Sequence, residues 1–235
     1  MGKFELNAQS VFDISRNEAF SEVLTSFLYK NNSTEEVINN LVLNNEILFH
    51  DITVLKAVIN RLKEDPLKVS SVNIHGKSID QYEQLIDVML GVPNDFRKQL
   101  IIEITEDYVS LRSRDFIKEL KTLGFKTALD DINKSIELQT LLRDLISYEE
   151  QDLIDFVKLS CSKGIPFRKS DSSCQWQLDD FELNFDGIFV FENITTIKDA
   201  EFIWKAFPTA LIQGYCFSRA TDFITSEEIT DNILI

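Results

Sequence analysis

Short apolar runs alternate with stretches of helical spacing along most of the chain. The runs have the length and composition of strands, whereas the stretches between them repeat apolar residues every three or four positions. We expect strands at Phe4–Phe12, Glu22–Leu28, Val69–Ile74, Gln99–Ile104, Phe125–Leu129, Ile154–Leu159, Phe185–Phe191 and Ala210–Tyr215. We expect helices at Glu35–Asn44, Leu48–Glu64, Ser78–Leu90, Ser110–Leu123, Ser135–Leu145 and Ile197–Ala206.

This regular alternation of strands and helices predicts an α/β fold with a parallel sheet. About eight such units indicate a closed, TIM-like (β/α)8 barrel. The chain has 235 residues and no linker rich in Pro, Gly or Ser, so we expect residues 1–235 to form a single barrel domain. The polar stretch Ser162–Asp180 is expected to be a long loop.

The composition is that of a globular protein, with 44% hydrophobic residues and only 7 Gly and 4 Pro. No apolar run approaches the ~20 residues that span a membrane. The first residues lack the apolar core of a signal peptide, so a cytoplasmic protein without a membrane partner is expected. The three cysteines lie in no paired spacing, which argues against a disulfide framework and a zinc ribbon.

The net charge of −15 narrows the choice of partner. A field of this sign repels nucleic-acid backbones, so we expect no DNA or RNA polymer to bind. A small phosphorylated ligand remains compatible if a local cation receives it. Clustered carboxylates are one way to hold such a cation.

Several of the expected strands carry an acidic residue toward one end. These acids are Glu22, Glu103, Asp130, Asp131 and Glu192. In an α/β barrel the carboxyl ends of the strands build a common site, and carboxylates that converge there repel one another unless a cation lies between them. Asn73 and Lys158 occupy comparable positions, and neither histidine does. An all-oxygen ligand set suits Mg²⁺ or Mn²⁺, and two such ions can clamp a phosphodiester and activate water.

Each of these residues also has an ordinary structural explanation. A single acid at a strand end can be a solvated loop residue or a helix cap, and Asn73 can cap the following helix. Lys158 can be a surface lysine or an ion-pair partner, and Glu106 can cap the helix near Ser110. The argument for a site therefore depends on the whole set.

Taken in order, these motifs resemble the EAL family, the bacterial phosphodiesterases that hydrolyse cyclic di-GMP, from about Phe4 to Phe223. The matching elements are the Glu-Ala-Leu signature at Glu22-Val23-Leu24, the Asn of an Asn-aliphatic-Ser element at Asn73, Glu-aliphatic-Thr-Glu at Glu103-Ile104-Thr105-Glu106, the paired aspartates Asp130-Asp131, Asp-x-x-Lys at Asp155-Phe156-Val157-Lys158, the first acid of Glu-Gly-Val-Glu at Glu192, and Gln-Gly-Tyr at Gln213-Gly214-Tyr215.

The resemblance implies a role for each residue. One metal would be held by Glu22, Asn73, Glu103 and Asp130. Asp130 and Asp131 would share or position the second metal and the attacking water, on which Lys158 and Glu192 would act. The substrate-binding residues would be Gln9, Gln213 and Asp155, and Glu106 would brace the loop after the fifth strand. The resemblance also implies Mg²⁺ or Mn²⁺ as the cofactor, a first strand antiparallel to the others, and leaves a homodimer open.

The chain departs from the family pattern at several positions. The loop after the paired aspartates, which couples dimerisation to metal binding in the family, reads Ile132-Asn133-Lys134-Ser135. The arginine after the signature is Ser26, and the Ser after the Asn is His75. The acid after Lys158 is Ser160, and the second acid of the Glu-Gly-Val-Glu element is Thr195.

Three functions follow from these observations. The first is metal-dependent hydrolysis of cyclic di-GMP to linear pGpG. The second is a catalytically silent EAL-like module that binds cyclic di-GMP or a protein partner, as the altered positions suggest. The third is an unrelated metal-dependent barrel enzyme.

Overall fold

The computed structural model describes residues 3–28, 33–105, 111–132, 153–161, 185–225 and 229. Its strands are β1 Phe4–Phe12, β2 Glu18–Phe27, β3 Ser70–Ile74, β4 Leu100–Thr105, β5 Lys126–Ile132, β6 Phe156–Ser160, β7 Ile188–Glu192, β8 Leu211–Gln213 and β9 Thr221–Ile224. Its helices are α1 Thr34–Leu43, α2 Ile47–Glu64, α3 Gly76–Ile79, α4 Tyr82–Leu90, α5 Asn94–Arg97, α6 Leu111–Leu123 and α8 Ile197–Ala206. The expected loop Ser162–Asp180, the expected helix Ser135–Leu145 and Glu106 lie outside the described residues.

The strands form a closed, eight-stranded mixed barrel with β9 outside it. Neighbouring strands from β2 to β8 are parallel, and β1 closes the barrel by pairing antiparallel with both β2 and β8. The predicted TIM-like α/β barrel with an antiparallel first strand is therefore confirmed. β9 pairs antiparallel with β1 at Leu6–Ala8, nearer the start of β1 than the Val11 and Phe12 that pair with β8, and this strand was not predicted.

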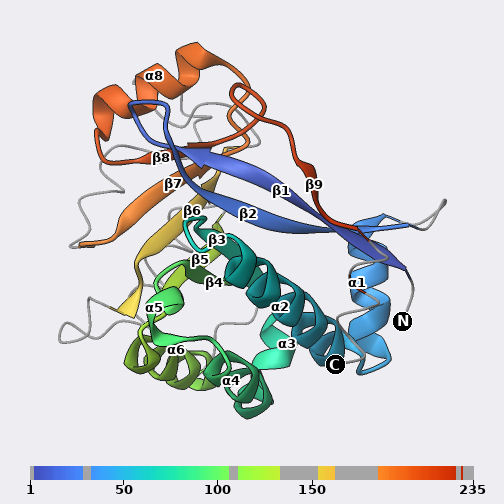
Figure 1. Cartoon of the computed structure of the whole chain (residues 1–235). Helices are drawn as coiled ribbons and strands as arrows, with labels where there is room; N and C mark the ends of the chain where they lie inside the picture. The colour runs from blue at the N-terminus through green and yellow to red at the C-terminus, as the bar shows by residue number, and fades with distance from the viewer. Residues whose placement is uncertain are drawn as a thin grey trace.

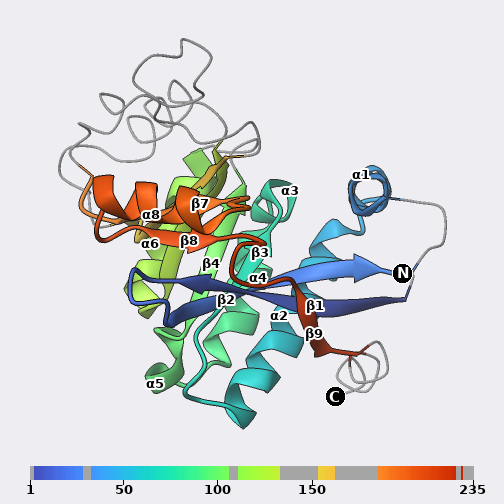
Figure 2. The same ribbon diagram turned by 90° about the horizontal axis from the view of Figure 1, so that it is seen from above.

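Helices cover the barrel on opposite sides, with α2, α4 and α6 on one side and α8 on the other (Figure 1). Figure 2, turned by 90°, shows α1 standing at the edge of the molecule beside β1 and β2. No helix within the described part of the chain is long and apolar enough to span a membrane.

Two separate apolar clusters follow from the alternation of side chains along each strand. The larger cluster lies between the barrel and its helices, and includes Ile102, Leu129 and Val157. The smaller cluster takes the alternate positions on the strands. It contains Val11, Phe20, Ile101, Ala128, Phe156, Val190 and Leu211. These residues fill one layer of the barrel interior, as side chains do in barrels of this kind.

Most predicted bounds differ from the observed ones by one to three residues, and two elements differ more. The predicted strand Glu22–Leu28 begins at Glu18, so Glu22 lies within β2 and not at its start. The predicted helix Ser78–Leu90 is two helices, α3 and α4, because Gln81 has a non-helical backbone (φ −129°, ψ 40°). By contrast, Phe4–Phe12 and Ile197–Ala206 have the predicted bounds.

A buried carboxyl joins α2 to the end of β3. The backbone N–H of His75 donates to Asp51 Oδ2 at 3.0 Å. This bond fixes the point at which the chain leaves β3, two residues after Asn73. Burial raises the pKa of Asp51 to about 7.

Candidate metal centre and active site

The polar site lies directly above the apolar layer inside the barrel. On strand after strand, an interior apolar residue is followed two positions later by a polar one. The pairs are Phe20 and Glu22, Ile101 and Glu103, Ala128 and Asp130, Phe156 and Lys158, Val190 and Glu192, and Leu211 and Gln213. Since the six strands that carry these pairs are parallel, the two-residue step places a second, polar layer toward their carboxyl ends.

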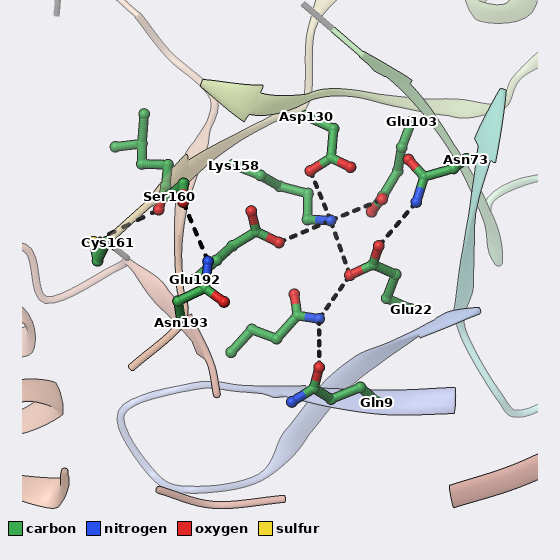
Figure 3. Close-up of polar contacts among 12 residues, drawn as sticks. Gln9, Glu22, Asn73, Glu103, Asp130, Lys158, Ser160, Cys161, Glu192 and Asn193 are labelled. Carbon is green, nitrogen blue, oxygen red and sulfur yellow. Dashed lines mark hydrogen bonds and ion pairs between the residues drawn. The ribbon is translucent and has the colours of Figure 1, made fainter. Parts of the chain in front are cut away.

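Lys158 lies at the centre of this layer. Its Nζ is 2.8 Å from Glu103 Oε2 and 2.8 Å from Asp130 Oδ1. It is also 3.0 Å from Glu22 Oε2 and 3.0 Å from Glu192 Oε1. The Lys158 side chain is fully buried, so one ammonium group is enclosed by four carboxylates that come from four different strands (Figure 3).

Amide side chains complete one wall of the cluster. Gln213 Nε2 donates to Glu22 Oε2 at 2.6 Å and to Gln9 Oε1 at 3.3 Å. Asn73 Nδ2 donates to Glu22 Oε1 at 2.9 Å. Both oxygens of Glu22 are therefore bound, which fixes its orientation and turns the oxygen of Asn73 away from it.

Burial and the central lysine act against each other on the pKa values of these acids. Burial raises the pKa of Glu103 and of Glu192 well above the usual range, and it raises the pKa of Asp130 to about 6, although Lys158 opposes these shifts. Burial also opposes ionisation of Glu22, but Lys158 and the donors around it hold its pKa below the usual value. The pKa of Lys158 is raised because the surrounding carboxylates outweigh its burial.

The residues present fit a divalent cation. Two sets of acids have oxygens within 4.8 Å of one another: Glu22, Glu103 and Asp130, and Asp130, Asp131 and Glu192. Asn73 Oδ1 and Glu103 Oε1 are buried oxygens with no hydrogen-bond donor among the described residues. Buried acceptors without donors are costly unless a cation or water binds them, and oxygen ligands are those that Mg²⁺ and Mn²⁺ prefer.

The second set includes Glu192 among the possible metal ligands, a role that the sequence did not predict for it. Glu192 was expected only to act on water, whereas its carboxylate lies within reach of the same cation as Asp130 and Asp131. Asp131 reaches this position through a left-handed backbone, with φ of 57°, directly after Asp130. Asp130 belongs to both sets.

Two adjoining cavities lead to this cluster. One, of about 340 Å³, is lined mainly by the acids together with Asn73, Thr105 and Leu24. The other, of about 180 Å³, is lined by Thr195, Gly214 and Tyr215. Both cavities are also bounded by Gln9, Glu192, Asn193 and Gln213. A ligand that binds at the acids thus has a continuous path over these four shared residues.

Gly214 is required by the close approach of two strand ends. A Cβ at this position would lie 2.1 Å from the backbone oxygen of Ile194. Ile194 in turn donates its N–H to Gln213 O at 3.1 Å and accepts from Cys216 N at 3.2 Å. The glycine of the Gln-Gly-Tyr element therefore keeps Gln213 and Glu192 on the same wall.

The structure brings together most of the predicted site residues, namely Gln9, Glu22, Asn73, Glu103, Asp130, Asp131, Lys158, Glu192 and Gln213. It does not bring Asp155 to them. Asp155 precedes β6, and its carboxylate is held by Lys121 Nζ and by the Thr127 backbone N–H, each at 2.8 Å. Thr127 lies at the amino end of β5 and Lys121 in the last turn of α6, so the structure places Asp155 apart from the other expected site residues and in an ion pair that joins α6 to the start of β6.

The altered positions also have defined places. Ser26 Oγ accepts from Asn7 Nδ2 at 2.7 Å. His75 caps α3 by accepting from Lys77 N at its Nδ1. Ser160 Oγ accepts from Asn193 Nδ2 at 3.2 Å. Asn193 lines both cavities and was missed from the sequence, although an Asn directly after a strand-end acid is a signal for a left-handed turn.

Comparison with known proteins gives the class of fold. No protein-family model and no curated protein matches the sequence. Among solved structures, an EAL domain protein from Listeria monocytogenes EGD-e is 22% identical, with a TM-score of 0.72, and the match covers 99% of this chain and 94% of that one. The FimX EAL domain of Xanthomonas citri in complex with c-diGMP is 14% identical, with a TM-score of 0.72, over 94% of this chain and 89% of that one.

A longer structure matches in its EAL part. Vibrio cholerae LapD S helix-GGDEF-EAL, bound to c-di-GMP, is 17% identical, with a TM-score of 0.75, and the match covers 92% of this chain and 53% of that one. This chain therefore spans about half of that LapD chain. It has the fold of EAL domains, which confirms at the level of the fold the resemblance found in the sequence.

Proposed function

We propose that residues 1–235 form one EAL-family domain that hydrolyses cyclic di-GMP to linear pGpG. The main support for this proposal is a pair of overlapping acid sets beside the buried Lys158. One set is Glu22, Glu103 and Asp130, and the other is Asp130, Asp131 and Glu192. Solved EAL domains with the same fold that are bound to cyclic di-GMP support the choice of ligand.

The first ion would be held by Glu22, Asn73, Glu103 and Asp130, and a second by Asp130, Asp131 and Glu192. When bound, Mg²⁺ or Mn²⁺ would neutralise phosphodiester charge and lower the pKa of a water. The remaining chemistry belongs to side chains. Lys158 supplies a preorganised positive charge near the phosphate oxygens, and Glu192 accepts a proton from the attacking water.

Gln9 and Gln213 would contact the guanine-bearing half of the ligand. Both line the two cavities, and Gln213 Oε1 is a buried acceptor with no donor within the described ranges. A ligand N–H would satisfy this oxygen. The function implies a bacterial protein that acts in the cytoplasm, and the net charge of −15 favours a small ligand over a nucleic-acid polymer.

The second candidate function is a silent module that binds cyclic di-GMP or a protein. It is favoured by Ser26, which replaces the family's arginine and whose hydroxyl already accepts a bond from Asn7. It is also favoured by Lys158, since its ion pairs with all four acids compete with metal binding. The intact oxygen-ligand sets favour the enzyme.

A turnover assay separates the candidates. The protein is incubated with cyclic di-GMP and Mn²⁺, Mg²⁺ or a chelator, and the products are separated by chromatography while calorimetry measures binding. Metal-dependent appearance of the linear dinucleotide supports hydrolysis. Tight binding without product selects the silent module, and the absence of both binding and product rejects hydrolysis and cyclic di-GMP binding, which leaves only a module that binds a protein.

A further inference from the structure

The chain makes a left-handed turn immediately after the acid at the end of β7. Asn193 has a φ of 61°, a conformation that residues other than glycine adopt at a cost and that Asn tolerates better than most. This turn ends β7 at Glu192, whose carboxylate points inward to Lys158 at 3.0 Å. The direction of the chain at Asn193 therefore affects the direction of the Glu192 side chain.

A side-chain hydrogen bond ties this turn to the neighbouring strand. Asn193 Nδ2 donates to Ser160 Oγ at 3.2 Å (Figure 3). Ser160 is paired with Glu192 in the register of β6 and β7, and it lies two residues beyond Lys158 on the same face of β6. The bond thus lies at the level of Glu192 on β7, one interior position beyond Lys158 on β6.

The backbone on either side of Asn193 is also held. Cys161 N donates to Glu192 O at 3.2 Å, and Ile194 N donates to Gln213 O at 3.1 Å. The Asn193 side chain adds a third attachment at the turn itself, and it faces both cavities. In the Glu-Gly-Val-Glu element this chain has Asn193 where the pattern has Gly. Two residues after Lys158 it has Ser160 where the pattern has an acid. The two altered residues contact each other.

We propose that Asn193 and Ser160 form a clasp that positions the Glu192 carboxylate for the reaction. The inference rests on the proposed function, since it concerns the orientation of Glu192 toward water. Glycine at position 193 would keep the left-handed turn but gain access to other backbone conformations and lose the bond to Ser160. Misplacing a reacting group by a fraction of an ångström lowers the rate of the chemical step more than it lowers ligand binding.

The test uses the full chain and the variants Ser160→Ala, Asn193→Gly and their combination. Asn45→Gly is a matched control, because exposed Asn45 has a φ of 57° and lies between α1 and α2, away from the site. Thermal unfolding with chelator present tests the clasp without any ligand. Each single variant is expected to lower Tm by roughly 3 °C and the double variant by no more than that. Additive losses would overturn the clasp.

Turnover of cyclic di-GMP with Mn²⁺ tests the positioning. Asn193→Gly and Ser160→Ala are each expected to lower kcat about tenfold with KM changed by less than about twofold, and Asn45→Gly to change neither. An unchanged kcat in Asn193→Gly, or a change in KM alone, would overturn the inference. In that case turnover by the parent would still support the proposed function.

If the parent yields no product, the proposed hydrolysis is rejected, but the positioning of Glu192 is not yet tested. The inference is then decided by Mn²⁺ titration, since Glu192 lies in the second acid set. A loss of about fivefold or more in Mn²⁺ affinity in Asn193→Gly but not in Asn45→Gly supports positioning of Glu192, by analogy with residues that orient metal ligands. Equal affinities, or no Mn²⁺ binding by the parent, overturn it.

Discussion

Lys158 and Glu103 form an ion pair of 2.8 Å in which neither side chain is accessible to solvent. The two residues come from β6 and β4, which are separated in the barrel by β5. Their contact therefore crosses the barrel interior. It places a positive charge at the point on which the buried acids converge, and it accounts for how these acids coexist without a metal.

We predict that removing this charge destabilises the metal-free protein. Lys158→Ala leaves Glu22, Glu103, Asp130 and Glu192 buried without their common cation, and breaking a buried pair in this way costs about 3–5 kcal/mol. Urea unfolding with chelator measures the loss, and Mn²⁺ should restore part of it. Lys56→Ala, which removes an exposed lysine of α2, is the control. Equal unfolding free energies for the two variants would count against the central role of Lys158.

Asp130 should be required for metal binding and dispensable for folding. Asp130→Asn is expected to weaken Mn²⁺ binding by at least roughly 100-fold, because Asp130 belongs to both acid sets. The pKa of Asp130 is raised from 3.8 to about 6 in the folded state, so the ionisation of Asp130 lowers stability as pH rises from about 4 through 6. Asparagine has no charge to bury, and the metal-free variant should therefore be no less stable than the parent near neutral pH.

Calorimetric titration with Mn²⁺ measures the first effect, and thermal unfolding with chelator measures the second. Asp115→Asn removes an exposed carboxylate of α6 and serves as the control. Unchanged Mn²⁺ affinity in Asp130→Asn would remove this residue from the metal site.

The buried carboxyl of Asp51 predicts a distinct pH dependence. Its pKa rises from 3.8 to about 7 on folding because of burial, so the folded state binds more protons between these values and stability falls as pH rises through that window. Asp51→Asn keeps an acceptor for His75 N–H and has no charge to bury. Between about pH 5 and about pH 8 the variant should gain roughly 3 kcal/mol relative to the parent.

Urea unfolding of parent and variant at the two pH values measures this difference. Burial lowers the pKa of His50 to about 4, and this group contributes stability that is lost as pH falls. Because His50 is present in both proteins, its contribution cancels. A parent-to-variant difference that does not change with pH would contradict the assignment to Asp51.

The glycine between Gln213 and Tyr215 should not tolerate a side chain. Gly214→Ala would place Cβ 2.1 Å from Ile194 O and 2.5 Å from Ile194 N, so the ends of β7 and β8 must separate. A loss of about 1–3 kcal/mol in stability, with weakened ligand binding, is expected. Gly91→Ala, which meets only Val88 O at 3.1 Å, is the matched control. Equal stability of Gly214→Ala and the parent would show that the strand ends can adjust freely.

The sequence could predict the polar layer because it follows from a two-residue period. Phe20 and Glu22 share a face of β2, as Phe156 and Lys158 share a face of β6, and such spacing is visible along the chain. The same information could have placed Asp155 apart from this layer, since it precedes the apolar run of β6 and must lie at the amino end of a parallel strand. Its match to a motif obscured its position.

Other features depend on contacts between distant parts of the chain. The bond between Asn193 and Ser160 joins residues 33 positions apart, and neither residue alone predicts it. The enclosure of Lys158 by four carboxylates requires the curvature of the closed barrel, which sets how far each side chain reaches across the interior. A linear pattern predicts the members of the site but not which one occupies its centre.

The central claim is that this acid-lined mouth hydrolyses cyclic di-GMP through its metal-binding acids, with Lys158 and Glu192 acting in the chemical step. The most direct measurement is the rate at which linear pGpG forms with Mn²⁺, compared for the parent, Lys158→Ala and Glu192→Gln under conditions in which each binds the ligand. We predict product from the parent only when metal is present, a rate about 100-fold or more lower in Lys158→Ala, and no detectable product from Glu192→Gln. Equal rates in all three proteins, or product that forms equally well with chelator, would contradict this account.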